Sequence, residues 1–362
     1  MERVGCFGSS YAKARAKFRD AATTAKAEIA CFENPNRGPA GEILATDVAW
    51  VGAGDAERVL VLVSGVHGVE GYCGSGVQVD WLRSGEARCL PDGTAVLLIH
   101  AANPHGFAWS RRVTEENVDL NRNWVDFGGT LPDNPGYSEL SEALLPREWN
   151  ARSRAASAAV FGGYIASHGV RGFQDVVSRG QYGDRQGLFY GGCEPTWARR
   201  TLSAILTGKL AAARRVAIVD HHTGLGPWGV AEEMVSEARG TPVFARAARW
   251  FGAAVTSTAG GGALSADLTG DGMVGMPRLL PQAEVTAITL EFGVRPIEET
   301  FDALRADAWL HRYGAPESRK GQRIRARMLA TFHDPSAAWK GMVLGQSRAA
   351  IRRALAGLNH PE

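Results

Sequence analysis

Five short segments of this chain carry residue types that together could form one metal-dependent hydrolytic site. They are 67–70 (HGVE), 111–112 (RR), 119–122 (DLNR), 220–223 (DHHT) and 290–293 (LEFG). A catalytic zinc ion typically takes three nitrogen or oxygen ligands from the protein and keeps a fourth position open for water. Two histidines and one carboxylate meet that need, and a further carboxylate can serve as the general base. The segments therefore predict a zinc site with hydrolytic chemistry.

The first segment places His67 and Glu70 three residues apart, shortly after the apolar run 58–64 (RVLVLVS). At that spacing, on a tight turn or a first helical turn, both side chains can reach one metal ion. Glycines on both sides of the pair allow the backbone to turn closely at this point. An isolated His-x-x-Glu pair is common by chance, so its position after a buried strand is what makes these two residues candidate ligands.

The adjacent histidines His221 and His222 are the candidates for the third ligand. They come directly after the run 215–220 (RVAIVD), which predicts a buried strand. Because successive side chains of a strand point to opposite faces, only one of the two can face the metal. His222 is the more natural choice, and Asp220 has the same parity, so Asp220 could support His222 from behind, as metal-bound histidines commonly require. His221 competes for the same role.

Glu291 ends an otherwise apolar run, 285–291 (VTAITLE). Burying a carboxylate without a partner costs several kcal/mol, so this side chain must be paired, at a metal or at the mouth of a cleft. A general base is the simplest role for it.

Strands and helices alternate along the chain. Apolar runs predict buried strands at 58–64, 95–101, 215–220 and 285–291, and an alternating run predicts a half-exposed strand at 42–51. Helical patterns occupy most of the remaining segments: 11–33, 71–82, 138–167, 195–213, 242–251, 296–312 and the arginine-rich remainder. This alternation predicts an α/β fold with a mixed, mostly parallel twisted sheet and helices on both faces.

Four polar residues come at or just beyond the carboxyl ends of predicted buried strands: His67, Asn103, His222 and Glu291. In open α/β sheets, ligands bind outside those strand ends. The sequence therefore predicts that four separate strands bring polar groups to one edge of the sheet.

The chain shows no internal repeat and no linker that clearly separates two domains. We therefore expect a single catalytic domain over 1–362, with a helical C-terminal extension from about 313 to 362. The glycine-rich loop 260–277 has no phosphate-binding frame, and it is better interpreted as a flexible lid or specificity loop.

Composition excludes several classes of protein. The formal net charge of +2 over 362 residues is too small to indicate a nucleic-acid or membrane partner. The five cysteines are odd in number and scattered, which favours reduced thiols over a disulfide framework. The first residues lack a signal-peptide pattern, and no stretch approaches the roughly 20 apolar residues of a membrane span. We expect a cytoplasmic protein; the sequence leaves its oligomeric state open.

These motifs occur in the order found in a known family. The sequence contains His67-x-x-Glu70, then 103–106 (NPHG), Arg112, 118–123 (VDLNRN), His222-Thr223 and finally Glu291. In this order it resembles the zinc carboxypeptidase family, and within it a little-characterised bacterial branch of deacylase- or peptidase-like proteins. The resemblance spans 59–293, about two thirds of the chain, and its most specific block is 103–123.

The resemblance implies a role for each matching residue. One zinc ion per chain would be held by His67, Glu70 and His222, and Asp119 would accept a hydrogen bond from the free ring nitrogen of His67. Glu291 would act as the general base towards water and then pass the proton to the leaving amine.

The remaining motif residues would contact the substrate. Arg112 would stabilise the oxyanion, with Arg111 as the fallback. Asn121 and Arg122 would bind a substrate carboxylate, a task for which the arginine fork is well suited, and Thr223 would join them. The resemblance thus implies hydrolysis of an amide bond next to a carboxylate, in a peptide or an N-acyl amino acid.

One departure from the family puts the substrate preference in doubt. Many carboxypeptidases place a mobile tyrosine over the substrate, yet no tyrosine occurs between His222 and Glu291; Tyr182 or Tyr190 could reach the site from another loop. A deacylase of N-acyl amino acids, similar to aspartoacylase, is the first alternative. A catalytically silent ligand-binding protein on the same scaffold is the second.

Overall fold

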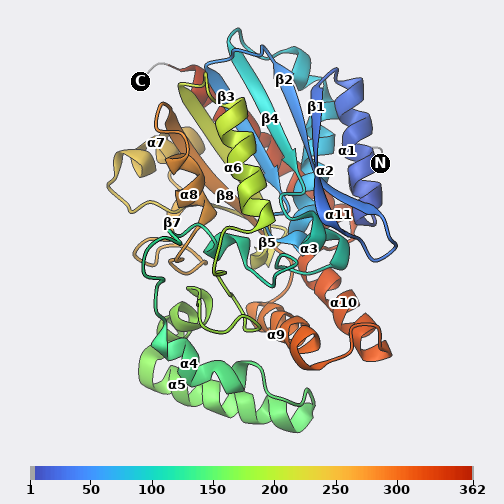
Figure 1. Ribbon diagram of the computed structural model, residues 1–362. Coiled ribbons are helices and arrows are strands. Elements are labelled where there is room, and N and C mark those ends of the chain that lie inside the picture. The colour runs from blue at the N-terminus through green and yellow to red at the C-terminus, as the bar shows by residue number, and fades with distance from the viewer. Residues whose placement is uncertain (1–4, 361–362) are drawn as a thin grey trace.

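A computed structural model describes residues 5–360, and a single eight-stranded sheet forms its centre (Figure 1). The strand order is β1-β2-β4-β3-β5-β8-β6-β7. Strands β4, β3, β5 and β8 are parallel, whereas β2 and β6 flank them in antiparallel orientation. The fold is therefore α/β with a mixed, mostly parallel sheet, as the sequence predicts. The strands are β1 Glu28–Arg37, β2 Ile43–Gly52, β3 Arg58–Ser64, β4 Thr94–His100, β5 Arg215–Trp228, β6 Ala231–Val235, β7 Thr256–Ser257 and β8 Glu284–Gly293.

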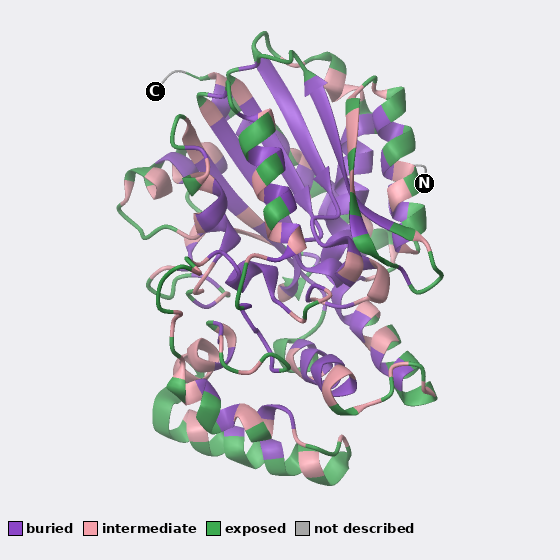
Figure 2. Ribbon diagram, viewed as in Figure 1, coloured by how far each residue is buried: buried purple, intermediate pink, exposed green. Residues whose placement is uncertain are grey.

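The middle of the sheet is covered on both faces, which explains its continuous apolar runs. In β3, residues 59–64 are all buried, and Val59 pairs with Ala95 of β4 and Val216 of β5. Branched side chains fit such a pleated, fully packed surface. Figure 2 shows the central strands as the largest buried part of the molecule.

Helices form a layer on each face of the sheet, as predicted. One face packs against α1 Tyr11–Thr24, α2 Gly71–Ser84, α7 Pro242–Phe251 and α11 Ala337–Asn359. The other face packs against α6 Trp197–Lys209 and α8 Gly272–Arg278. Within α11, Trp339 and Ile351 are fully buried, so this last helix is part of the main core. No helix within residues 5–360 is long and apolar enough to cross a membrane.

Four further helices lie beyond the carboxyl ends of the parallel strands (Figure 1). We call them the helical cap: α4 Pro135–Leu144, α5 Ala151–Ser178, α9 Ile297–Tyr313 and α10 Arg319–Phe332. They share a separate hydrophobic cluster that includes Leu144, Phe161, Leu310 and Met328. Helix α5 is interrupted at Gly169, whose φ of 74° and ψ of 165° are not helical. A left-handed φ of this kind is easily adopted by glycine.

Short elements complete the chain. They are α3 Pro104–Trp109 and the 3-10 turns η2 Gly68–Glu70, η3 Glu86–Arg88 and η4 Leu120–Arg122. The turn η2 follows His67 and ends at Glu70, and the turn η4 contains Asn121 and Arg122.

The prediction of one helix over 11–33 is wrong. Helix α1 ends at Thr24, Lys26 takes a left-handed φ of 59°, and β1 begins at Glu28. Residues 28–33 instead pair in register with β2, from Glu28 opposite Trp50 to Glu33 opposite Ala45. Hydrogen bonding to a neighbouring strand has overridden the local helical pattern.

Three smaller expectations also need correction. Strand β2 is buried at all but its two end residues, because both of its faces are packed, so it is not half-exposed. The helical region 138–167 is two helices, α4 and α5, separated by a segment that contains Pro146. The predicted loop 260–277 ends in α8, and the short strands β6 and β7 have no apolar run to reveal them.

The buried histidine His100 predicts a pH dependence of stability. It is fully buried at the end of β4, where its Nε2 lies 2.9 Å from Ser75 Oγ, and burial lowers its pKa to about 4. An unfolded histidine titrates near pH 6.5, so below that pH the unfolded chain binds a proton that the folded chain does not. The free energy of unfolding should therefore fall between about pH 6.5 and pH 4, with a contribution on the order of 3 kcal/mol from this residue.

Urea unfolding at pH 7 and at pH 4.5 measures this effect. The stability difference between the wild type and His100→Gln should shrink as the pH falls, because only the wild type carries the penalty. The exposed His168 on α5 provides the control, since His168→Gln should keep the wild-type pH dependence. A constant difference for His100→Gln across this range would contradict the assignment.

Candidate active site

Three candidate metal ligands converge at the carboxyl edge of the sheet. His67 follows β3, Glu70 ends the η2 turn, and His222 lies within β5. His67 Nδ1 is 3.0 Å from both His222 Nδ1 and Glu70 Oε1, and His222 Nδ1 is 2.9 Å from Glu70 Oε2. All three residues are buried. Their nitrogen and oxygen atoms lie close enough together to bind one metal ion.

The η2 turn is held in place by backbone contacts. Gly68 N–H donates to the Arg112 carbonyl (3.0 Å), and Val69 N–H donates to the Arg111 carbonyl (2.8 Å). A Cβ atom on Gly68 would lie 2.0 Å from the carbonyl carbon of Gly106, so only glycine allows this close approach to α3. This contact fixes the direction in which His67 and Glu70 point.

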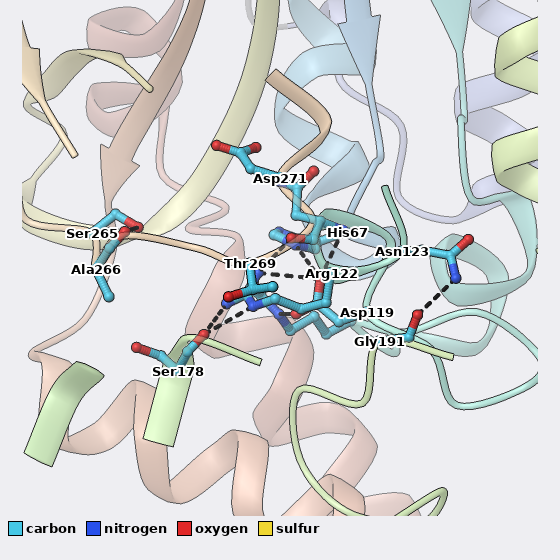
Figure 3. Close-up of polar contacts among 12 residues, drawn as sticks. His67, Asp119, Arg122, Asn123, Ser178, Gly191, Ser265, Ala266, Thr269 and Asp271 are labelled. Carbon is cyan, nitrogen blue, oxygen red and sulfur yellow. Dashed lines mark hydrogen bonds and ion pairs between the residues drawn. The ribbon is translucent and has the colours of Figure 1, made fainter. Parts of the chain in front are cut away.

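The outward nitrogens of both histidine rings meet carboxylates. His67 Nε2 is 3.1 Å from Asp119 Oδ1, and His222 Nε2 is 2.7 Å from Asp220 Oδ2 (Figure 3 draws the first pair). A carboxylate accepts the Nε2 proton and so leaves the Nδ1 lone pair facing inward. Two such lone pairs and the Glu70 carboxylate would repel one another unless a proton or a metal ion lay between them. The donor set of two histidines and one carboxylate fits a zinc ion.

The charges in this cluster shift one another's protonation. Burial alone would raise the pKa of Glu70, but His67 and His222 outweigh it and lower that pKa below its usual range. Burial alone would lower the pKa of His222, yet Asp220 and Glu70 raise it well above its ordinary value. Such strongly shifted groups, gathered beside a cavity, are typical of functional sites.

The structure separates the two adjacent histidines. His222 faces the ligand cluster together with Asp220, whereas His221 points to the opposite side, where its Nδ1 lies 3.3 Å from the Val63 carbonyl oxygen. Burial lowers the pKa of His221 to about 4. Their opposite directions follow from the alternation of side chains along β5.

The two adjacent arginines are separated in the same way. Arg112 donates from Nε to Asp119 Oδ2 (2.9 Å) and from Nη1 to Glu70 Oε1 (3.2 Å). Arg111 instead donates to Asp307 Oδ2 (3.1 Å) and Asn117 Oδ1 (2.9 Å). Only Arg112 borders the cavity described below, so Arg111 is not brought to the site.

Glu291 lies on β8 directly beside His222 in the register of the sheet. Its Oε1 accepts a hydrogen bond from Leu225 N–H (3.0 Å), and no residue within 5–360 donates a hydrogen bond to Oε2. Burial and the charge of Glu70 raise the pKa of Glu291 to about 8. A carboxylate with a raised pKa beside a candidate metal centre is suited to taking up and releasing a proton near neutral pH.

A cavity of about 480 Å³ opens onto this cluster. It lies between the sheet edge and the helical cap, and residues from both line it. Seven of the residues singled out in the sequence border it: His67, Arg112, Asn121, Arg122, His222, Thr223 and Glu291. Asp119 and Asp220 stand behind the ring nitrogens and do not border it.

Asn121 and Arg122 come from the η4 turn, which is capped by Asp119. Arg122 is buried, and its guanidinium donates to the Ser178 carbonyl at the end of α5 (2.9 Å from Nε) and to the Asn121 carbonyl (3.1 Å from Nη1) (Figure 3 shows the Ser178 contact). The side-chain oxygen of Asn121 is buried without a hydrogen-bond partner among the described residues. A buried unpaired acceptor on a cavity wall calls for a ligand donor.

Thr223 contributes mainly through its backbone. Its N–H donates to Glu70 Oε2 (3.0 Å), and its hydroxyl donates to the Phe332 carbonyl (2.7 Å). It therefore borders the cavity while holding Glu70 in place. Neither Tyr182 nor Tyr190 borders the cavity; Tyr182 donates from its hydroxyl to the Arg122 carbonyl (2.7 Å).

Two cavity residues escape sequence reasoning. Phe189 holds a left-handed φ of 53°, and its ring lies 5.5 Å from the Arg112 guanidinium carbon and 5.3 Å from that of Arg122. The ring thus supports both arginines by cation–π contact. Asp271 caps α8, accepting from Met273 N–H (2.9 Å), and burial raises its pKa. The glycines after Phe189 were the only signal of its unusual turn.

Fold and site together define an α/β protein with a histidine–glutamate–histidine donor set at the carboxyl edge of its sheet. The chain belongs to the family described as "Protein of unknown function (DUF2817)", whose model matches residues 7–346. A comparison with curated proteins gives no significant match.

A comparison with solved structures finds proteins of low sequence identity that are similar to this chain. The ectoine utilization protein EutE (DoeB) from Ruegeria pomeroyi is 12% identical, with a TM-score of 0.44 over 90% of this chain and 67% of that one. Carboxypeptidase A from Helicoverpa armigera is also 12% identical, with a TM-score of 0.44 over 90% of this chain and 74% of that one. A succinylglutamate desuccinylase from Silicibacter sp. TM1040 is 11% identical, with a TM-score of 0.45 over 90% and 66%. The chain spans about two thirds of the first and third of these proteins.

Proposed function

We propose that this protein is a zinc-dependent hydrolase that cleaves an amide bond next to a carboxylate. The observation that carries the proposal is the meeting of three metal donors, His67, Glu70 and His222, beside a cavity that His67, His222 and Glu291 border. A structural zinc site would have no use for a further carboxylate beside the three donors.

His67, Glu70 and His222 would hold the zinc ion. When bound there, zinc would act as a Lewis acid on the scissile carbonyl and would lower the pKa of water. The residues around it supply the rest of the chemistry. Glu291 would take a proton from the attacking water at its Oε2 and then pass it to the leaving amine.

Arginines would handle the negative charges of the substrate and of the transition state. Arg112 is held by Asp119 and Glu70 through Nε and Nη1, so its Nη2 remains able to donate to a developing oxyanion. Arg122 donates to backbone carbonyls from Nε, Nη1 and Nη2, so Nη1 and Nη2 each keep one N–H group for a substrate carboxylate. Asn121, with its unpaired oxygen, would accept from a substrate N–H group.

The test is a substrate panel with purified protein and measured zinc content. Blocked dipeptides and N-acyl amino acids are offered in parallel, with and without a chelator that is later displaced by added zinc. Hydrolysis of amides that carry a free carboxylate, its loss with the chelator and its recovery with zinc are expected. Turnover that is indifferent to the chelator would contradict the role of zinc and end the proposal. Absence of turnover for every member of the panel in the zinc-loaded protein would also end it and would favour a silent ligand-binding protein.

The same panel separates the peptidase from the deacylase. A carboxypeptidase prefers a peptide on the acyl side of the scissile bond, whereas a deacylase prefers a simple acyl group. The apolar walls of the cavity favour the deacylase.

A further inference from the structure

The cavity is polar at the metal donors and at the arginines, but two of its walls are apolar helix faces. On α5 the lining residues Val170, Phe173 and Val177 recur with helical spacing. On α9 the lining residues Ile297, Phe301 and Leu304 recur with similar spacing. We call these six residues the apolar channel. Such stripes usually bury themselves against each other.

The outer end of the apolar channel is not buried. Val170 is 70% exposed, Ile297 is 51% exposed, and Leu264 of the loop before α8, which borders the same cavity, is 45% exposed. Three large apolar side chains from three different elements are thus exposed where they border one cavity. Apolar residues gathered at the rim of a cavity indicate a site that receives an apolar group.

The inner part of the channel is firmly built. The rings of Phe161, Phe173 and Phe301 pack with centroid distances of 5.3 to 6.0 Å, which joins α5 to α9. On the other side, Gln174 Nε2 donates to the Leu264 carbonyl (2.7 Å), which joins α5 to the glycine-rich loop. The break at Gly169 divides α5, and most of the α5 residues that line the cavity come after it, with Ile165 before it. The walls are therefore preformed around an open space.

We propose, on the basis of the hydrolase function above, that the substrate is an N-acyl amino acid whose long apolar acyl chain lies in the apolar channel. The amino-acid side chain is one carbon from the carboxylate, so it must share the end of the cavity that holds Asn121, Arg122 and Asp271. The acyl chain is the part of the molecule that can leave this end. Seven helical residues span about 10 Å, which matches roughly eight extended carbon–carbon bonds.

Binding tests the channel independently of turnover. The Glu291→Gln variant is titrated by calorimetry with acetyl-, hexanoyl- and decanoyl-alanine, and with acetyl-phenylalanine. Affinity should rise about fourfold for each added methylene group until the channel is filled. Equal affinity for the acetyl and decanoyl compounds would overturn the proposal. A gain confined to acetyl-phenylalanine would assign the channel to the amino-acid side chain and would overturn it too.

Two matched variants on α5 locate the binding surface. Val170→Asp places a charge on the rim, whereas Val160→Asp places the same charge on an exposed valine (47%) of the same helix that does not border the cavity. The first should weaken decanoyl-alanine binding by about tenfold or more and leave acetyl-alanine unchanged. The second should leave both unchanged. An equal loss in the two variants, or no loss in either, would contradict the channel.

Kinetics of the wild-type protein distinguish this proposal from the hydrolase itself. If the series is hydrolysed with no dependence on chain length, the channel is wrong and the hydrolase stands. If decanoyl-alanine binds tightly, and Val170→Asp weakens it, but no compound is hydrolysed by the zinc-loaded protein, the hydrolase is wrong and the channel stands as a binding site.

Discussion

Replacing Glu291 with glutamine should abolish nearly all hydrolysis while zinc stays bound. The amide keeps the shape of the side chain, and its oxygen can still accept from Leu225 N–H. It cannot take up a proton, so the attacking water loses its base. Positioned acid–base groups contribute roughly 10²- to 10⁴-fold to a rate, and kcat should fall by that range. Zinc content by mass spectrometry and kcat for the best substrate of the panel are the measurements.

A matched glutamate separates this loss from a general effect of charge. Glu299 lies exposed in the first turn of α9, outside the cavity, and Glu299→Gln makes the same replacement of a glutamate by a glutamine away from the site. Its kcat should stay within about twofold of the wild type. Full activity of Glu291→Gln would remove Glu291 from the mechanism, and loss of zinc from it would show that the residue also stabilises the metal centre.

Replacing His222 with glutamine should weaken zinc binding by far more than 100-fold. Loss of a group that merely orients a ligand costs about 10- to 100-fold in metal affinity, and His222 is itself one of the three donors. Hydrolysis should disappear together with the metal. Zinc affinity from competition with a chromophoric chelator measures the first effect, and the substrate panel measures the second.

The neighbouring residue offers the control for that variant. His221 is equally buried, but it points to the opposite side of β5 and lies near the Val63 carbonyl. His221→Gln should keep zinc affinity within about tenfold, even if it lowers the thermal stability of the chain. If His221→Gln loses zinc while His222→Gln retains it, the ligand set is wrong.

The sheet could be predicted because its strands obey a simple physical rule. A run such as 58–64, with every inner residue apolar, is stable only when both faces are covered, and β3 begins and ends at those residues. The convergence of His67, His222 and Glu291 follows from the same rule, since parallel strands end at one edge. Alternation along β5 also explains why His222 and Asp220 face the cluster together.

Other features depend on contacts that the sequence pattern does not contain. Strand β1 reads locally as helix, and only its pairing with β2 makes it a strand. The adjacent Arg111 and Arg112 have the same chemistry, and the backbone of one turn decides which of them borders the cavity. In the sequence, Val170, Phe173 and Val177 of α5 have the spacing of any amphipathic helix. Only the packing of α5 against α9 shows that they line a cavity. No alternation of apolar and polar residues in the sequence predicts the left-handed backbone conformation of Phe189.

The break at Gly169 has a consequence for protein engineering. The proposed catalytic residues come from strand ends, whereas the apolar walls of the cavity come largely from residues 170–178 and from α9. The outer part of α5, residues 151–168, contributes one residue to the cavity, Ile165. One could therefore retarget the proposed hydrolase by transplanting the helical turns after Gly169, and attach reporters or surface charges at exposed positions of the outer part, without changing the residues around the metal donors.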